Sequence, residues 1–274
     1  MKIQLEQAGI VLFESALFRT VTTLVIGQDY LLLVDPNWLP REVDFISTYL
    51  QPYQKGRTCY LLFTHSDYDH IIGYGKFKGF QTIASKNFVE NPKQAEILQE
   101  MADFDDQYYI TRDYPIQYPE INHIIDAENQ LQLGEDMYQF HQAVGHNSDG
   151  IIAHNLSRQM LIVGDYLSNI EFPYIYESVA EYKKTLDVLE RIIRTNDIKL
   201  FITGHGDATR EKSEMYQRIK DARTYIKHLE NSVQIEEEFD TDLLFPRYQF
   251  PKIMSQFHEA NLTLARKELL QNQS

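Results

Sequence analysis

Six consecutive residues in the first third of the chain hold four side chains of the kinds that bind metals. The run HSDYDH, residues 65–70, follows the apolar segment TCYLLFT, residues 58–64, which predicts a strand. Side chains alternate in an extended chain, so the first, third and fifth residues of the run are expected on one side, with the sixth opening a helix. Four ionisable groups so close would repel one another unless a cation held them. The run therefore predicts the metal ligands His65, Asp67, Asp69 and His70.

Three later segments repeat one pattern, in which an apolar strand is followed by glycine and then by a possible ligand. AVGHNSDG contains His146, LIVGDYLS contains Asp165 and FITGHGD contains His205. Glycine lets the backbone turn sharply before each ligand, and strand ends are where α/β folds place reactive groups. Imidazoles and carboxylates without thiolates suit Zn, Fe or Mn better than Mg or Ca.

Taken in order, these four segments resemble the metallo-β-lactamase superfamily. Its motif is His-x-His-x-Asp-His, followed by Gly-His, Gly-Asp and Gly-His. LLLVDPNW around Asp35 also resembles the family's early strand, which ends in an aspartate that supports the site. The resemblance runs from Leu31 to about His205 and implies an α/β fold, a four-layer αββα sandwich with metals at one edge of its two sheets. The residues that match the metal motif are His65, Asp69, His70, His146, Asp165 and His205.

One position departs from the family pattern, since Asp67 stands where a second histidine is usual. Flavodiiron proteins have glutamate there, and DNA-uptake channel proteins of competence systems have aspartate. Asp67 is expected to bind a metal directly, to bind through water, or to support His65. As a ligand it would bring a third carboxylate, which lowers the charge of the site, raises the pKa of bound water and favours Mn or Fe.

The resemblance implies a hydrolase with two divalent metal ions, zinc first, with iron or manganese as alternatives. His65, Asp67 and His146 would hold one metal. Asp69, His70 and His205 would hold the other, and Asp165 would bridge them. A metal-bridging hydroxide, oriented by the catalytic residue Asp69, would attack a small ester, thioester, lactone or phosphodiester. Chemistry like that of glyoxalase II or a lactonase is favoured.

Three alternatives stay open at this point. A flavodiiron-like di-iron redox protein is suggested by Asp67, although the sequence shows no flavodoxin segment. A nuclease or phosphodiesterase is suggested by the same substitution. A metal-binding module without catalysis is disfavoured by the intact ligand set.

Composition limits the partners. The chain has 274 residues and a net charge of −14, which disfavours nucleic acid because phosphate binding normally needs a basic patch. A small-molecule substrate is expected, and a homo-oligomer is neither indicated nor excluded. No apolar run approaches a membrane span, and the N-terminus does not resemble a signal peptide. With Cys59 as the only cysteine, no intrachain disulfide can form, and a cytoplasmic location is the expectation.

Strands and helices alternate through the sequence, which predicts one domain over residues 1–274, with a helical C-terminal extension over about 209–274. The stretch 103–119 is acidic and aromatic, and its tyrosines either line a pocket or pack against the surface. Strands are expected at 20–27, 30–34, 58–64, 139–143, 150–155, 160–163 and 199–203, and helices at 41–50, 87–101, 179–194, 209–229 and 251–270.

Overall fold

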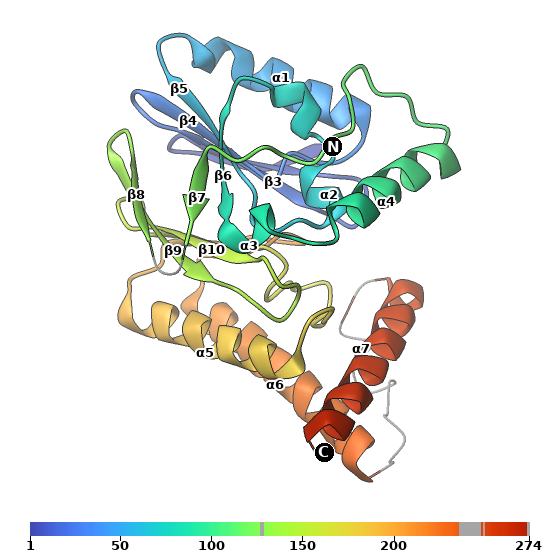
Figure 1. Ribbon diagram of the computed structural model, residues 1–274. Helices are drawn as coiled ribbons and strands as arrows, with labels where there is room; N and C mark the ends of the chain where they lie inside the picture. The colour runs from blue at the N-terminus through green and yellow to red at the C-terminus, as the bar shows by residue number, and fades with distance from the viewer. Residues whose placement is uncertain (127–128, 236–247, 249, 273–274) are drawn as a thin grey trace. The chain divides into compact units, whose positions relative to one another are not determined.

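The computed structural model describes residues 1–126, 129–235, 248 and 250–272 (Figure 1). By its internal contacts the chain divides into two compact units. The first comprises residues 1–141 and 149–158, and the second comprises residues 142–148 and 159–274. Each unit has its own helices and its own group of candidate metal ligands.

A seven-stranded sheet forms the centre of the first unit, with the strand order β1-β2-β3-β4-β5-β6-β7. The first four strands pair antiparallel, and β3 and β4 form a hairpin whose turn contains Gln28 and Asp29. The last four strands pair in parallel, so the ends of β4, β5 and β6 lie at one edge. The strands are β1 (Lys2–Gln7), β2 (Ile10–Glu14), β3 (Val21–Ile26), β4 (Tyr30–Val34), β5 (Thr58–Leu62), β6 (Gln81–Ser85) and β7 (His123–Ile125).

Helices cover one face of this sheet because their apolar residues recur at helical spacing. In α1 (Pro40–Gln54), the buried residues Val43, Ile46 and Leu50 lie on one side of the helix. They join a core with Phe13 and Leu33 of the sheet, to which the neighbouring helices also contribute (Figure 1). These are α2 (Tyr68–Ile71), a 3₁₀ turn (Tyr74–Phe77), α3 (Lys86–Val89) and α4 (Gln94–Gln107).

The first unit also contains β8 (Gln130–Leu133), β9 (Asp136–Gln142) and β10 (Ile151–Asn155), with β8 and β9 antiparallel. A buried polar cluster ties these strands to β4. The Asp136 carboxylate accepts hydrogen bonds from Tyr30, Arg158 and Asn155. Because the buried carboxylate is paired with a guanidinium and two neutral donors, it is satisfied within the protein.

The second unit combines a parallel strand pair with long helices. The strands β11 (Met160–Ile162) and β12 (Leu200–Ile202) pair in parallel, and α5 (Val179–Thr195) connects them. Ser178 caps α5 by accepting a hydrogen bond from the Glu181 amide. The two long helices α6 (Lys212–Ile235) and α7 (Pro251–Asn272) follow, and both contact α5 (Figure 1).

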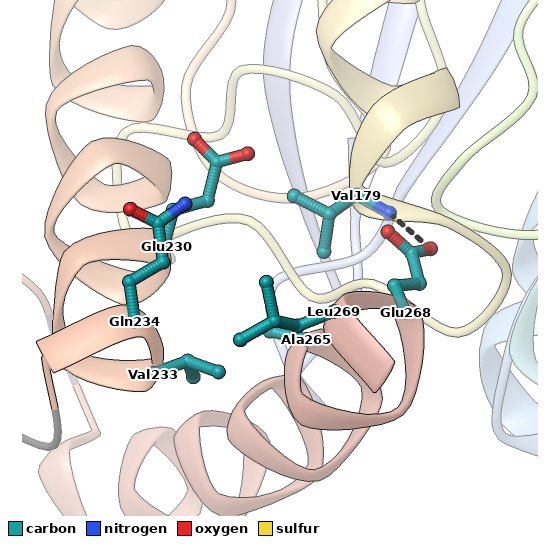
Figure 2. A pocket seen from close by; sticks show the side chains of 7 residues that line it. All are labelled: Val179, Glu230, Val233, Gln234, Ala265, Glu268 and Leu269. Carbon is teal, nitrogen blue, oxygen red and sulfur yellow. Dashed lines mark hydrogen bonds between the residues drawn. The ribbon is translucent and has the colours of Figure 1, made fainter. Parts of the chain in front are cut away.

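A small pocket lies where α5, α6 and α7 approach one another (Figure 2). The side chains of Val179, Val233, Ala265 and Leu269 give it an apolar lining. At its edge, the Glu268 carboxylate of α7 accepts a hydrogen bond of 2.9 Å from the Val179 amide. A carboxylate at a helix N-terminus satisfies a backbone donor and interacts favourably with the helix dipole, so α7 stabilises the start of α5.

The longer predicted elements agree with the structure to within a few residues. The helix predicted at 87–101 is divided into α3 and α4, with Pro92 between them. Five strands were not predicted, namely β1, β2, β6, β7 and β8. None of the described helices combines the length and apolar character needed to cross a membrane.

Candidate metal centre

Four candidate ligands of the first unit lie just beyond β5, where the parallel strands end. The chain leaves β5 at Leu62 and enters α2 at Tyr68, with Asp67 as the residue before the helix. The expectation of an extended run to residue 69, with His70 opening the helix, was therefore wrong by two residues. Asp69 and His70 instead project from the first turn of α2. Both histidines of the run are buried, and the ring centroids of His65 and His70 lie 4.1 Å apart.

Asp35 organises the histidines of this group. Its Oδ1 accepts a hydrogen bond from the Thr64 amide at 2.8 Å, and its Oδ2 accepts one from the Thr64 hydroxyl at 2.6 Å. Oδ2 also lies 3.1 Å from Nδ1 of His70. Since a carboxylate only accepts, His70 carries its proton on Nδ1. Asp35 thus has the supporting role that the resemblance implied.

The Nε2 atoms of the two histidines face the carboxylates of the run. Thr64 donates its hydroxyl proton to Asp35, so its oxygen accepts from Nδ1 of His65 at 2.9 Å. Nε2 of His65 lies 3.6 Å from Oδ2 of Asp67, and Nε2 of His70 lies 3.4 Å from Oδ2 of Asp69. Each pair offers one nitrogen and one oxygen, and both are atoms that divalent metals such as zinc bind.

A further buried carboxylate holds the backbone of the run. Asp149 accepts hydrogen bonds from the Ser66 amide at 3.2 Å and from the Asn91 side chain at 2.7 Å. The side-chain amide of Asn91 also donates a hydrogen bond to the Ser66 hydroxyl at 2.9 Å. Burial raises the pKa of Asp149, and these hydrogen bonds oppose that rise. Neither Asp149 nor Asn91 was identified from the sequence: Asp149 belongs to the segment AVGHNSDG but does not follow its glycine directly, and Asn91 lies in no ligand motif.

The second unit brings together the other three predicted ligands. Oδ2 of Asp165 lies 3.5 Å from Nε2 of His146 and 3.1 Å from Nε2 of His205. Both histidines are buried and Asp165 is partly exposed. One carboxylate oxygen therefore lies within reach of two imidazole nitrogens. That arrangement suits a shared ligand.

A glycine with a positive φ angle lies beside each of these three ligands, which explains why glycine stands there. Gly145 has a φ of +127°, and a Cβ there would lie 2.3 Å from the Tyr182 backbone nitrogen. No larger residue fits before His146 without moving α5. Beside His205 the positive φ of +85° belongs to Gly206, which follows the ligand, and not to the preceding glycine, for which a sharp turn was expected.

His146 is fixed through both its backbone and its ring. Its backbone amide donates a hydrogen bond to the Tyr166 hydroxyl at 3.0 Å. Its Nδ1 lies 2.7 Å from the Tyr174 carbonyl oxygen, and a carbonyl only accepts, so the proton is on Nδ1. Nε2, which lies 3.5 Å from Oδ2 of Asp165, is then the nitrogen that carries the lone pair.

The imidazole nitrogens and carboxylate oxygens of these residues are atoms that divalent metals bind. His65, His70 and His146 each bind a protein oxygen through Nδ1, an arrangement that fixes the ring and its tautomer in metal-binding histidines. Among the described residues, the groups of candidate ligands include none of the other five histidines. Those are His123, His141, His154, His228 and His258.

Aromatic side chains surround Tyr68, which lies between two candidate ligands. The rings of Trp38 and Phe104 stack with centroids 4.9 Å apart, and Tyr68 contacts both.

On α4, burial raises the pKa of Glu100, and the Asp67 carboxylate raises it further. Of the tyrosines in the stretch 103–119, Tyr114 and Tyr118 pack in the core, whereas Tyr108 and Tyr109 are exposed.

Comparison with known proteins identifies the class. Residues 16–205 match the model of the metallo-beta-lactamase superfamily, and the chain belongs to that superfamily. The predicted α/β fold, the αββα sandwich of this family, is thereby confirmed. No curated protein matches the chain in sequence.

Solved structures share this fold at low sequence identity. A beta-lactamase domain protein from Burkholderia ambifaria has 17% identity and a TM-score of 0.68, over 97% of this chain and 89% of that chain. A metallo-beta-lactamase family protein from Thermus thermophilus has 17% identity and a TM-score of 0.66, over 97% and 94%. The inverting sec-alkylsulfatase Pisa1 from Pseudomonas sp. has 14% identity and a TM-score of 0.67, over 95% of this chain. The chain spans about half of that sulfatase, 49% of its length.

Proposed function

We propose that the protein is a metal-dependent hydrolase that holds two divalent metal ions. In this proposal His65, Asp67 and His146 would hold one metal, Asp69, His70 and His205 would hold the other, and Asp165 would be shared between the two. Membership of the superfamily supports it. The observation that carries it is the fixed orientation of His65, His70 and His146, whose Nδ1 atoms are all engaged by protein oxygens.

Bound divalent metals would supply Lewis acidity and a water molecule of lowered pKa, which is what hydrolysis at neutral pH needs. The chain's own residues supply the rest. Asp35 and Thr64 hold the imidazoles of the first unit, and Tyr174 holds His146. Asp69, on the first turn of α2, is proposed to orient the attacking water as well as to bind. Such positioning lowers the barrier because the reacting groups need not be ordered during the reaction.

The proposed substrate is a small ester, thioester, lactone or phosphodiester, with reactions like those of glyoxalase II or a lactonase first. The net charge of −14 favours small substrates over nucleic acid. The name of the Pseudomonas relative adds a secondary alkyl sulfate ester to the candidates. We also propose the cytoplasmic location that was expected from the sequence.

For the metals we propose zinc first, with manganese or iron as alternatives. Asp67 adds an oxygen ligand where the family usually has nitrogen, and oxygen ligands favour harder metals. The distance of 3.6 Å between Asp67 and His65 suits two ligands of one ion.

The test is a substrate panel applied to the protein loaded separately with Zn, Mn or Fe. The panel contains chromogenic esters, lactones, thioesters, phosphodiesters and alkyl sulfates. At least one should be hydrolysed with Zn or Mn in air. Asp165→Ala should abolish this activity by removing the shared carboxylate. Asp197→Ala, at an exposed position that pairs with Lys199, is the matched control and should retain it.

Two outcomes would contradict the proposal. Loss of activity to the same degree in both variants would show that Asp165 has no special role. Activity that appears only with iron and a supplied reductant, without any hydrolysis with redox-inert zinc, would favour a flavodiiron-like redox protein.

A further inference from the structure

A buried asparagine in the C-terminal helix makes hydrogen bonds in several directions. Asn261 of α7 is completely buried. Its Oδ1 accepts a hydrogen bond from the Ile175 amide at 2.9 Å. Its Nδ2 donates to the Pro173 carbonyl at 2.7 Å and to the Tyr225 hydroxyl at 2.8 Å. The side chain therefore uses both ends of its amide, and two of the three bonds go to the backbone of one short segment.

The residue between those two backbone contacts is Tyr174. Asn261 binds the carbonyl of Pro173 and the amide of Ile175, so the peptide groups on both sides of Tyr174 are held. The ring of Tyr174 also stacks on Phe257 of α7, with the ring centroids 4.0 Å apart and the ring planes at 15° to each other. The backbone and the ring of Tyr174 are thus both fixed by the same helix.

The Tyr174 carbonyl is the group that accepts the Nδ1 proton of His146, at 2.7 Å. A histidine ligand needs such a partner, because the partner selects the tautomer and sets the direction of Nε2. Displacement of this carbonyl would either lengthen the hydrogen bond or rotate the ring. The direction of Nε2 therefore depends on a carbonyl whose position depends on α7.

We propose that Asn261 is a positioning residue for His146, and that α7 is in this way a functional part of the metal site and not only a covering helix. The inference rests on the proposed function for the role of His146 as a ligand. It adds that the direction of His146 Nε2 is set by Asn261, a residue 115 positions further along the chain.

A purely structural role for Asn261 makes a different prediction, and the chain offers a variant that separates the two. The Tyr225 hydroxyl belongs to the same cluster, accepting from Asn261 and bonding to Nδ1 of His258 at 3.1 Å. Tyr225→Phe removes this hydroxyl but leaves both bonds from Asn261 to the backbone around Tyr174. It should disturb the packing of α7 without moving the Tyr174 carbonyl.

The experiment measures the affinity of the full chain for Zn²⁺ by competition with a chromophoric chelator. Asn261→Ala should weaken the binding by about 10- to 100-fold, the usual effect of losing support for a ligand. Tyr225→Phe should change it less than about twofold on the same scale. Asn261→Asp preserves the volume and the acceptor for Ile175, and should fall between wild type and Asn261→Ala. It also keeps the test open if the alanine variant does not fold.

A second measurement, the ¹⁵N NMR shifts of His146, reports on the ring without any metal. The wild type should show the tautomer protonated on Nδ1, and Asn261→Ala should show a mixture of tautomers. Equal zinc affinity in wild type and both Asn261 variants, with the tautomer unchanged, would overturn the inference. An equal loss in Asn261→Ala and Tyr225→Phe would do the same, since packing alone would explain it. A wild type that binds no zinc but shows the tautomer change would instead contradict the proposed function.

Discussion

The carboxylate of Asp35 binds His70 and the residue before His65 at the same time, with its Oδ2 3.1 Å from Nδ1 of His70 and 2.6 Å from the Thr64 hydroxyl. One negative charge therefore supports two imidazoles that lie side by side. Its place at the end of β4, next to β5 in the sheet, makes this contact possible.

Asp35→Asn should weaken metal binding by about 10- to 100-fold while the fold is retained. The amide has a similar shape, but it lacks the charge and presents a donor to one of its two partners. Equilibrium dialysis against zinc or manganese measures the effect. The control is Asp44→Asn, which removes an exposed carboxylate of α1 that pairs with Lys76. The same affinity in both variants would show that Asp35 has no role in ligand support.

Asp67→His should shift the metal preference towards zinc. The change restores the commoner nitrogen ligand and removes one negative charge, and nitrogen ligands suit zinc better than manganese. Metal analysis of the wild type and the variant, each equilibrated with an equimolar zinc and manganese mixture, gives the ratio directly. Asp67→Asn separates the effect of charge from that of ligand type. An unchanged ratio in Asp67→His would mean that Asp67 does not bind a metal.

Asp149→Ala should destabilise the fold by about 2–3 kcal/mol, because the Ser66 amide and the Asn91 side chain lose a buried acceptor. Urea unfolding measures the change. Asp126→Ala, at an exposed site near Lys86, should stay within about 0.5 kcal/mol of wild type. If the Asp149 variant also stayed within that range, the buried hydrogen bonds would make no net contribution to the free energy of unfolding.

The stability of the protein should fall on acidification through His154. Burial, with a smaller contribution from the neighbouring His141, lowers the pKa of His154 to about 4. The folded state therefore resists protonation that the unfolded chain accepts below about 6.5. The neutral form contributes fully above that pH, and the contribution is lost as the pH falls from about 6.5 towards 4.

Between pH 7.5 and 5 this linkage should cost about 2 kcal/mol in the free energy of unfolding. His154→Phe, which cannot titrate, should lose less stability over the same interval. The difference between the two proteins, measured by urea unfolding at each pH, isolates His154 from the other ionisable groups. An identical pH dependence in both would exclude His154 as the cause.

The candidate ligands were predictable because each follows an apolar strand, and strand ends are local features of a sequence. The group in each unit was also predictable, since its members share one motif or one strand-glycine pattern. The helix α2 was misplaced because four residues, Tyr68–Ile71, are too few to show a helical period. The three-residue strand β7 was also missed, whereas β11 and β12, which are equally short but wholly apolar and buried, were predicted.

The residues that support the ligands could not be predicted. Asp149 holds Ser66 across 83 positions, and Asn261 holds Ile175 across 86. Such contacts depend on which elements meet in the folded chain, and an isolated aspartate or asparagine has no local pattern. By contrast, Asp35 was identified because it ends a recognisable strand of the family.

The stack of Trp38 on Phe104 gives the protein a built-in optical probe. Trp38 is the single tryptophan of the chain, it is buried, and it contacts Tyr68, which follows Asp67. Its fluorescence spectrum should therefore report on the unfolding of the first unit. Emission should move to longer wavelength when that unit unfolds and water reaches the indole. Circular dichroism also follows the long helices of the second unit, so the two signals together can show whether the units melt in one transition or in two.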